Sequence, residues 1–332
     1  MNIFRKYAII NPSPHKEKFM DLLIWLAVIG MITLYTFQSL FTKLYTDNYP
    51  GDPNLASSVL TVVSGLTVAI VTFTCFSLCK FTFNGWSILI GVLNAFALYG
   101  YNHFIVKASG SGPYSVVMMF NVAGGIVIPI IAALVMGWDG SWSTPFQIVL
   151  NSVCITAIIA AVYLVSQKQG NTEEKQGITL PFILACFGLG VCNGIYGIFL
   201  TLQQQTQAAG GEGNRDEMII VTFLVAAIMA FVTGTVQTKG KFLPHFRQTK
   251  RSLIYLIITS IIFTLAINLI VIIIPLFDTT ILYTLDNSAV LIMSVLISAI
   301  FFGEKLSAKN IVGIALMCAA LVSMNLLPAI FI

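Results

Sequence analysis

The chain has 332 residues, of which 57% are hydrophobic and 9% are charged, and its mean hydropathy is +0.91. An ordinary soluble domain has about 25% charged residues, and a soluble fold of this size could not bury so much apolar surface, so the water-soluble classes are excluded. A membrane-spanning helix needs about 20 mostly apolar residues. The apolar runs here are that long and do not alternate with polar residues as barrel strands do. We therefore predict an all-α polytopic membrane protein.

Ten apolar segments with short polar connections are predicted to be membrane-spanning helices. In chain order they are 22–44, 57–79, 85–106, 113–136, 145–166, 181–204, 218–236, 253–274, 278–302 and 308–327. Three of them begin at a proline, which the first turn of a helix tolerates because its N–H group has no partner there. Residues 1–20 are predicted to form an N-terminal tail, and the polar residues 167–177 a central linker.

An internal repeat becomes visible when the chain is shifted against itself by 166 residues. In this frame Asn102 aligns with Asn268, Asn121 with Asn287, and Gly137 with Gly303. We therefore predict two five-helix repeats, residues 21–166 and 178–332. Because five is an odd number, the second repeat enters the membrane in the opposite direction. This inverted arrangement is typical of secondary transporters, whose binding sites lie near the midplane between the repeats.

A local motif follows the ninth segment. The residues LIMSVLI precede Gly303-Glu304-Lys305-Leu306-Ser307, and NIVGIA follows from Asn310. This motif resembles the end of an EamA-like repeat of the drug/metabolite transporter superfamily. The first repeat reads Gly137-Trp138-Asp139-Gly140 at this point, without a counterpart of Glu304. The resemblance implies ten helices in two inverted repeats, and transport of small metabolites, amino acids, sugars or drugs.

Asp286 is the main candidate for a functional side chain. It lies about nine residues into its segment, which is roughly 13 Å along a helix that rises 1.5 Å per residue. A carboxyl group at that depth is costly unless it faces a cavity or a partner, and such a group is by default a functional candidate. The alternative is a structural hydrogen bond to Tyr283, three residues earlier on the same helix face.

Further polar residues lie inside the predicted helices. Asn121 and Asn287 occupy equivalent places in the two repeats, either lining a cavity or holding helices together by hydrogen bonds. Asn102 and Asn268 have the same two interpretations. The sixth segment carries Asn193 and Tyr196 among four glycines, which indicates close helix packing or a bend at a binding site. Tyr35 is the counterpart of Tyr196 in the first segment, and Glu304 is interpreted as a cap of the helix that follows it.

The distribution of these polar groups predicts which helices surround a cavity. The first, third, fourth, sixth, eighth and ninth segments carry most of them and should enclose a central cavity. The fifth and tenth segments are almost wholly apolar and should lie at the periphery or pair with each other.

Catalytic and metal-binding motifs are lacking in the sequence. It contains no HExxH, GxSxG or P-loop motif, and its six cysteines lie in apolar runs without the spacing of metal ligands. We therefore expect no enzyme activity, no cofactor or metal, and no nucleic acid as partner. The alternatives to a transporter are an intramembrane enzyme and a non-transporting receptor or assembly subunit.

The leading hypothesis is a secondary transporter that exports or exchanges a small organic metabolite, amino acid or drug-like molecule, with protons as a candidate coupling ion. One intramembrane carboxylate favours a cationic or neutral polar substrate over a strongly anionic one. The expected location is the lipid bilayer of a bacterial plasma (inner) membrane, with a homodimer as an option.

Two arguments about orientation conflict. The resemblance implies that both termini are cytoplasmic, which leaves six of the 17 Lys and Arg residues on the cytoplasmic side. The positive-inside rule favours the reverse. We keep the orientation that the family implies.

Overall fold

All of the long elements in the described part of the chain are α-helices. The computed structural model describes residues 14–136, 142, 144–166, 179–208, 210–211, 213–246, 248–273, 279–304 and 308–331. Its α-helices are α2 (Pro14–Asn48), α3 (Pro53–Val71), α4 (Gly85–Ser109), α5 (Tyr114–Met136), α6 (Pro145–Ser166), α7 (Leu180–Ala208), α8 (Arg215–Gln237), α9 (Lys250–Ile273), α10 (Thr279–Phe301) and α11 (Ala308–Phe331). A π-helix, η1 (Thr72–Phe76), continues α3, and a 3₁₀ helix, η3 (Leu243–Phe246), lies between α8 and α9.

Eight of these helices are long and apolar enough to cross a membrane. α10 and α11 contain shorter apolar stretches, Leu285–Phe301 and Ala308–Met324. The protein is therefore an integral membrane protein. Each predicted segment coincides with a helix, but α2 is longer than expected and begins at Pro14, inside the stretch predicted to be a tail. The second segment changes from α-helix to π-helix at Thr72. The predicted linker 167–177 lies outside the described residues.

Side-chain caps explain where several helices begin. Asp52 accepts a hydrogen bond from the amide of Asn54, next to a proline at the first helical position of α3. Asn84 caps α4 by accepting from the amide of Ser87, and Asn214 caps α8 in the same way. Such caps satisfy amide groups that have no partner inside the helix.

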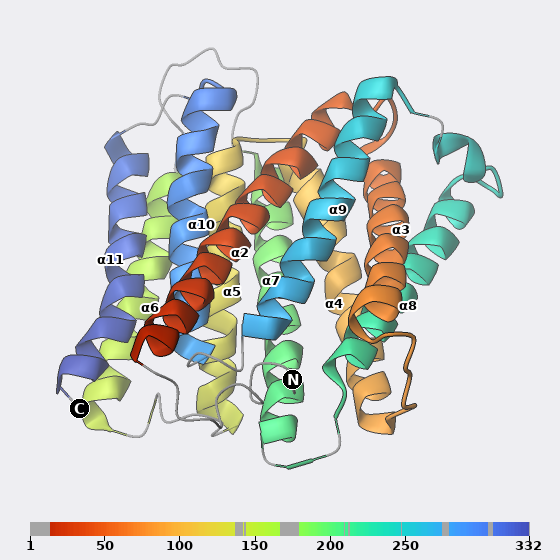
Figure 1. Ribbon diagram of the computed structural model, residues 1–332. Helices are drawn as coiled ribbons and strands as arrows, with labels where there is room; N and C mark the ends of the chain where they lie inside the picture. The colour runs from red at the N-terminus through yellow and green to blue at the C-terminus, as the bar shows by residue number, and fades with distance from the viewer. Residues whose placement is uncertain are drawn as a thin grey trace.

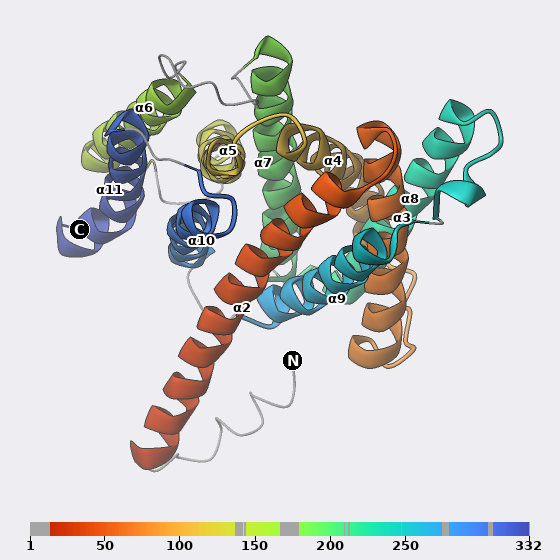
Figure 2. The same cartoon turned by 90° about the horizontal axis from the view of Figure 1, so that it is seen from above.

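The helices of the first and second halves of the chain are interleaved. α2 packs on α9 and α10, α4 on α7 and α8, and α3 on α8 and α9. α5 packs on α7 and α10, and α6 packs on α11. Figure 1 shows α2 crossing the molecule diagonally in front of α5 and α7. In Figure 2, α6 and α11 lie side by side at one end of the molecule, next to α5 and α10. This confirms the predicted pairing of the fifth and tenth segments.

Glycines allow α5 and α7 to approach very closely. A Cβ atom added to Gly124 would lie 2.1 Å from the carbonyl oxygen of Gly190, and one added to Gly194 would lie 2.5 Å from the carbonyl oxygen of Gly124. Larger residues cannot fit between two backbones at that distance. The glycines of α7 therefore pack closely against α5, as one of the two sequence interpretations held.

Candidate functional site

A cavity of about 110 Å³ lies between six helices. Its lining residues come from α2, α4, α5, α7, α9 and α10, which are the first, third, fourth, sixth, eighth and ninth predicted segments. The predicted set of helices is confirmed. α3, α6, α8 and α11 contribute no residue to the described lining.

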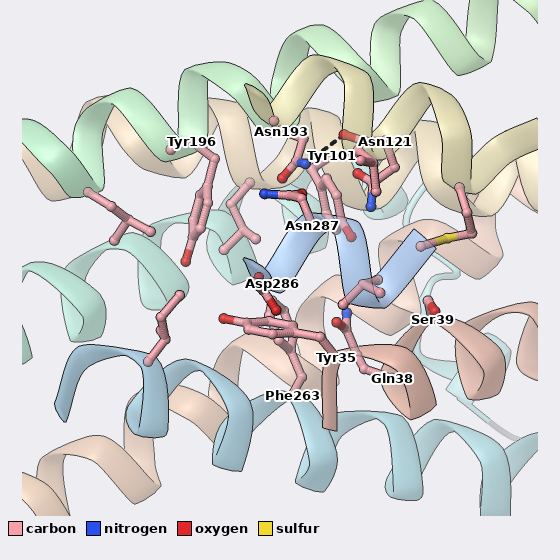
Figure 3. A pocket seen from close by; sticks show the side chains of 18 residues that line it. Tyr35, Gln38, Ser39, Tyr101, Asn121, Asn193, Tyr196, Phe263, Asp286 and Asn287 are labelled. Atoms are coloured by element: carbon pink, nitrogen blue, oxygen red, sulfur yellow. Dashed lines mark hydrogen bonds between the residues drawn. The ribbon is translucent and has the colours of Figure 1, made fainter. Parts of the chain in front are cut away.

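Polar side chains from both halves of the chain line this cavity. Figure 3 shows Asp286 and the ring of Tyr35 on the side of α2 and α9, with Asn121 and Asn193 on the side of α5 and α7. Of the predicted site residues, six line the cavity: Tyr35, Asn121, Asn193, Tyr196, Asp286 and Asn287. The described lining includes no Lys, Arg or His residue.

Asp286 lies in this lining with an unsatisfied oxygen. Its Oδ1 atom is buried and has no hydrogen-bond partner among the described residues. Most buried polar atoms in folded proteins have at least one such partner, and each exception needs an explanation. This oxygen therefore belongs to the cavity lining and has no described partner in the fold.

Asn193 and Asn287 converge at a glycine of α5. The Nδ2 group of Asn193 donates to the backbone carbonyl of Asn121 at 2.9 Å. A Cβ atom added to Gly125 would lie 2.7 Å from Asn193 Nδ2 and 3.4 Å from Asn287 Oδ1. The absence of a side chain at Gly125, in the first half of the chain, thus makes room for two amides from the second half.

Three predicted residues lie outside the described lining. Asn268 is buried and exchanges hydrogen bonds with the side chain of Thr72, with donor–acceptor distances of 3.0 and 3.1 Å. It joins α9 to η1, which matches the interpretation as a contact between helices. Asn102 is buried in α4 and does not reach the cavity. The side chain of Tyr283 lies outside the described residues, so its proposed bond to Asp286 stays a prediction.

Sequence reasoning missed several lining residues. Tyr101, Ser39, Phe263 and Gly125 belong to the lining but were not selected. Tyr101 is the direct neighbour of Asn102, and successive residues of a helix point about 100° apart. The polarity of Asn102 predicts that its face of α4 lines the cavity, but the neighbouring face does so, through the phenol group of Tyr101.

A polar cluster joins four helices at one end of the molecule. The Nζ group of Lys43 in α2 donates to the carbonyl oxygen of Ser109 at 2.6 Å and to Asp47 at 3.0 Å, and it lies 5.7 Å from the ring centre of Phe302. Ser109 is the last residue of α4, where carbonyl groups lack helical partners. The Lys43 side chain is only 5% exposed, and the sequence reading overlooked it because it lies near a helix end.

Glu304 belongs to the same end of the molecule. Its carboxylate accepts from the amides of Tyr114 and Ser115 at the start of α5, and from the hydroxyls of Ser115 and Ser298. The predicted capping role is therefore correct in kind but assigned to the wrong helix. Glu304 caps α5, because the turn after α10 folds back against the start of that helix.

Comparisons with known proteins find a structure of similar fold but no function. No protein-family model matches the chain, and no curated protein matches it. A solved structure described only as "Crystal structure of protein" is similar, with a TM-score of 0.56 and 15% sequence identity. The match covers 91% of this chain and 96% of the other chain. The likeness at this identity concerns the fold alone.

Proposed function

We propose that the protein is a secondary transporter of a small cationic or neutral polar organic molecule, built as an EamA-like pair of inverted five-helix repeats. Helix packing supports the repeat. A shift of 166 residues pairs the helices as α2 with α7, α3 with α8, α4 with α9, α5 with α10 and α6 with α11. If every helix is replaced by its counterpart, the contact of α2 with α9 becomes the contact of α7 with α4. The contacts of α5 with α7 and of α4 with α8 become those of α10 with α2 and of α9 with α3.

Chain direction supports the same arrangement. In Figure 1, α2 runs from the lower to the upper edge of the molecule, whereas α7 runs from the upper to the lower edge. The pairs α3 and α8, α5 and α10, and α6 and α11 each contact each other, as helices near a two-fold axis do. An axis of this kind in the membrane plane is the basis of alternating access in inverted-repeat transporters.

The observation that carries the proposal is the composition of the cavity. Its lining helices form three counterpart pairs, α2 with α7, α4 with α9, and α5 with α10. A polar cavity at the interface of two repeats is where secondary transporters bind their substrates. A movement of one repeat against the other could expose such a cavity to either side of the membrane in turn. The energy would come from exchange or from an ion gradient, with protons as the candidate ion.

The location follows from the same proposal. An exporter or exchanger of small organic molecules in the plasma membrane of a bacterium fits both the fold and the resemblance in the turn at Glu304. No described feature favours the intramembrane enzyme or the receptor over this function.

Flux into proteoliposomes tests the proposal. Vesicles containing the purified chain are incubated with a defined mixture of amino acids and small amines, and the solutes taken up are quantified by mass spectrometry. Leu200→Trp places a bulky ring in the cavity lining and should abolish the protein-dependent uptake. Leu184→Trp on the same helix is the matched control, because Leu184 is 58% exposed on the outer surface. Uptake that is the same with Leu200→Trp as with the unaltered chain would contradict a transport route through this cavity.

A further inference from the structure

The lining of the cavity combines a carboxyl group with aromatic rings. Asp286 Oδ1 is buried without a described hydrogen-bond partner, and the rings of Tyr35, Tyr196 and Phe263 line the same cavity. The described lining contains no cationic side chain that could neutralise the carboxylate. The ion pair between Lys43 and Asp47 lies outside the cavity lining.

We infer that the cavity binds a small organic monocation, an ammonium group attached to an apolar body, and that Asp286 is the group that pairs with its charge. This inference rests on the proposed transport function and specifies the substrate class of the same site. It goes beyond the choice between cationic and neutral molecules that the sequence leaves open.

Electrostatics favours a cation over the other charge types. A buried carboxylate without a counter-charge is strongly disfavoured in a medium of low dielectric constant, and an opposite charge at close range restores the balance. An anionic ligand would add a like charge next to Asp286. A neutral ligand could donate a hydrogen bond to Oδ1 but would bring no opposite charge to stabilise the ionised carboxylate.

The aromatic rings match the same ligand. The face of a tyrosine or phenylalanine ring attracts a cation within about 6 Å of its centre. In Figure 3 the Asp286 carboxyl group lies beside the Tyr35 ring, with Phe263 on the same side of the cavity. An ammonium group held by the carboxylate would therefore approach aromatic surface, and an apolar body could occupy the space near Leu98, Met118 and Val290.

The opposite side of the cavity gives a second recognition element. Asn193 and Asn287, which converge at Gly125, offer amide groups to a polar substituent at the far end of the ligand. The cavity volume of about 110 Å³ corresponds to roughly seven to eleven water molecules at about 10–15 Å³ each, and so to a small solute.

Three probes of matched shape test the charge preference. The full chain, purified in detergent, is titrated at neutral pH with 2-phenylethylammonium, with the neutral 2-phenylethanol, and with the anionic 3-phenylpropionate, and dissociation constants are measured by calorimetry. The expected result is at least tenfold tighter binding of the ammonium than of the alcohol, and no measurable binding of the carboxylate. Equal binding of all three would overturn the inference.

Variants assign the preference to Asp286. Asp286→Asn should bring the affinity for the ammonium down to that for the alcohol, and Asp286→Glu should retain most of the preference. Asp52→Asn is the matched control, because asparagine also caps a helix and Asp52 lies outside the cavity. If Asp286→Asn still prefers the ammonium over the alcohol, Asp286 is not the group that pairs with the charge of the ligand.

The outcomes separate this inference from the proposed function. If vesicles take up solutes through the cavity but the protein binds the three probes equally, the cation site is refuted and the proposed transport function stands. Binding of the ammonium that depends on Asp286, without flux of any solute in the mixture, would refute the transporter and leave the cation site.

Discussion

Glu304 accepts a hydrogen bond of 2.6 Å from the backbone amide of Tyr114. Through this bond the turn that ends α10 caps the first turn of α5, a helix 190 positions earlier in the chain. A carboxylate at a helix N-terminus satisfies free amide groups and interacts favourably with the helix dipole. The turn at Glu304 therefore connects the two halves of the chain by hydrogen bonds.

Glu304→Gln should weaken this connection. The carboxylate accepts hydrogen bonds with both of its oxygens. The amide of glutamine has only one acceptor oxygen, and its NH₂ group would face amides and hydroxyls that now donate to the carboxylate. Hydrogen bonds to charged groups contribute about 1.5–3 kcal/mol, so the free energy of unfolding should fall by about that amount. The thermal unfolding midpoint in detergent measures the change, with Asp52→Asn as the control that keeps its cap. An unchanged midpoint would show that water replaces the cap at no cost.

Gly124→Ala should disrupt the contact between α5 and α7. The added methyl group would lie 2.1 Å from the backbone oxygen of Gly190, and neither backbone can move without displacing its helix. We expect a loss of folded protein, measured as the monodisperse fraction after size-exclusion chromatography. Gly85→Ala is the control, since no atom lies within 4 Å of its added methyl group. Similar yields of the two variants would contradict the close approach.

Asn268 and Thr72 should be energetically coupled. Asn268→Leu and Thr72→Val each remove one side of the hydrogen-bonded pair between α9 and η1. Hydrogen bonds between helices in membranes contribute on average about 0.6 kcal/mol, with a maximum of about 1.7 kcal/mol. A double-mutant cycle of unfolding free energies should give a coupling in that range. Additive effects of the two substitutions would mean that the pair contributes no stability.

The positions of the helices can be predicted from the sequence, but only part of the candidate site can. Apolar runs of the required length identify a membrane helix without knowledge of its neighbours, so segments such as 145–166 agree with α6 at both ends. Which side of a helix faces the cavity depends on its neighbours. That is why Asn102 was chosen in place of Tyr101, and why the space at Gly125 was not foreseen. Asp286 was foreseen because a carboxyl group inside an apolar run is costly in any packing arrangement.

Labelling of single cysteines tests the orientation. Lys241 and Lys80 are both exposed; Lys241 follows α8, and Lys80 follows η1, which continues α3. In Figure 1, α3 and α8 run in opposite directions, so that they end at opposite edges of the molecule. In whole cells whose protein has all six native cysteines replaced by serine or alanine, a membrane-impermeant maleimide should modify Lys241→Cys and leave Lys80→Cys unmodified. The reverse pattern would place the basic segment in the cytoplasm, as the count of Lys and Arg residues favours.

Asp286→Asn should abolish gradient-driven accumulation in proteoliposomes and leave the unfolding midpoint intact. The substitution keeps the shape of the side chain and removes its charge, and no other carboxyl group belongs to the described lining of the cavity. If the carboxylate pairs with the substrate, counterflow exchange fails as well. If it carries only a coupling proton, exchange persists. Uptake at the rate of the unaltered chain, with the same pH dependence, would make Asp286 a structural residue.

The interleaving of the two halves has a consequence for biogenesis. α2 and α4 meet their main partners, α9 and α7, only after those helices have been synthesised. Asp286 lies in α10, and the other five helices that line its cavity precede α10 in the chain. A carboxyl group inside a membrane is costly, and here the helices that can shield it from lipid are synthesised before it. A chain that stops before α10 would lack the three lining residues that this helix contributes, Asp286, Asn287 and Val290.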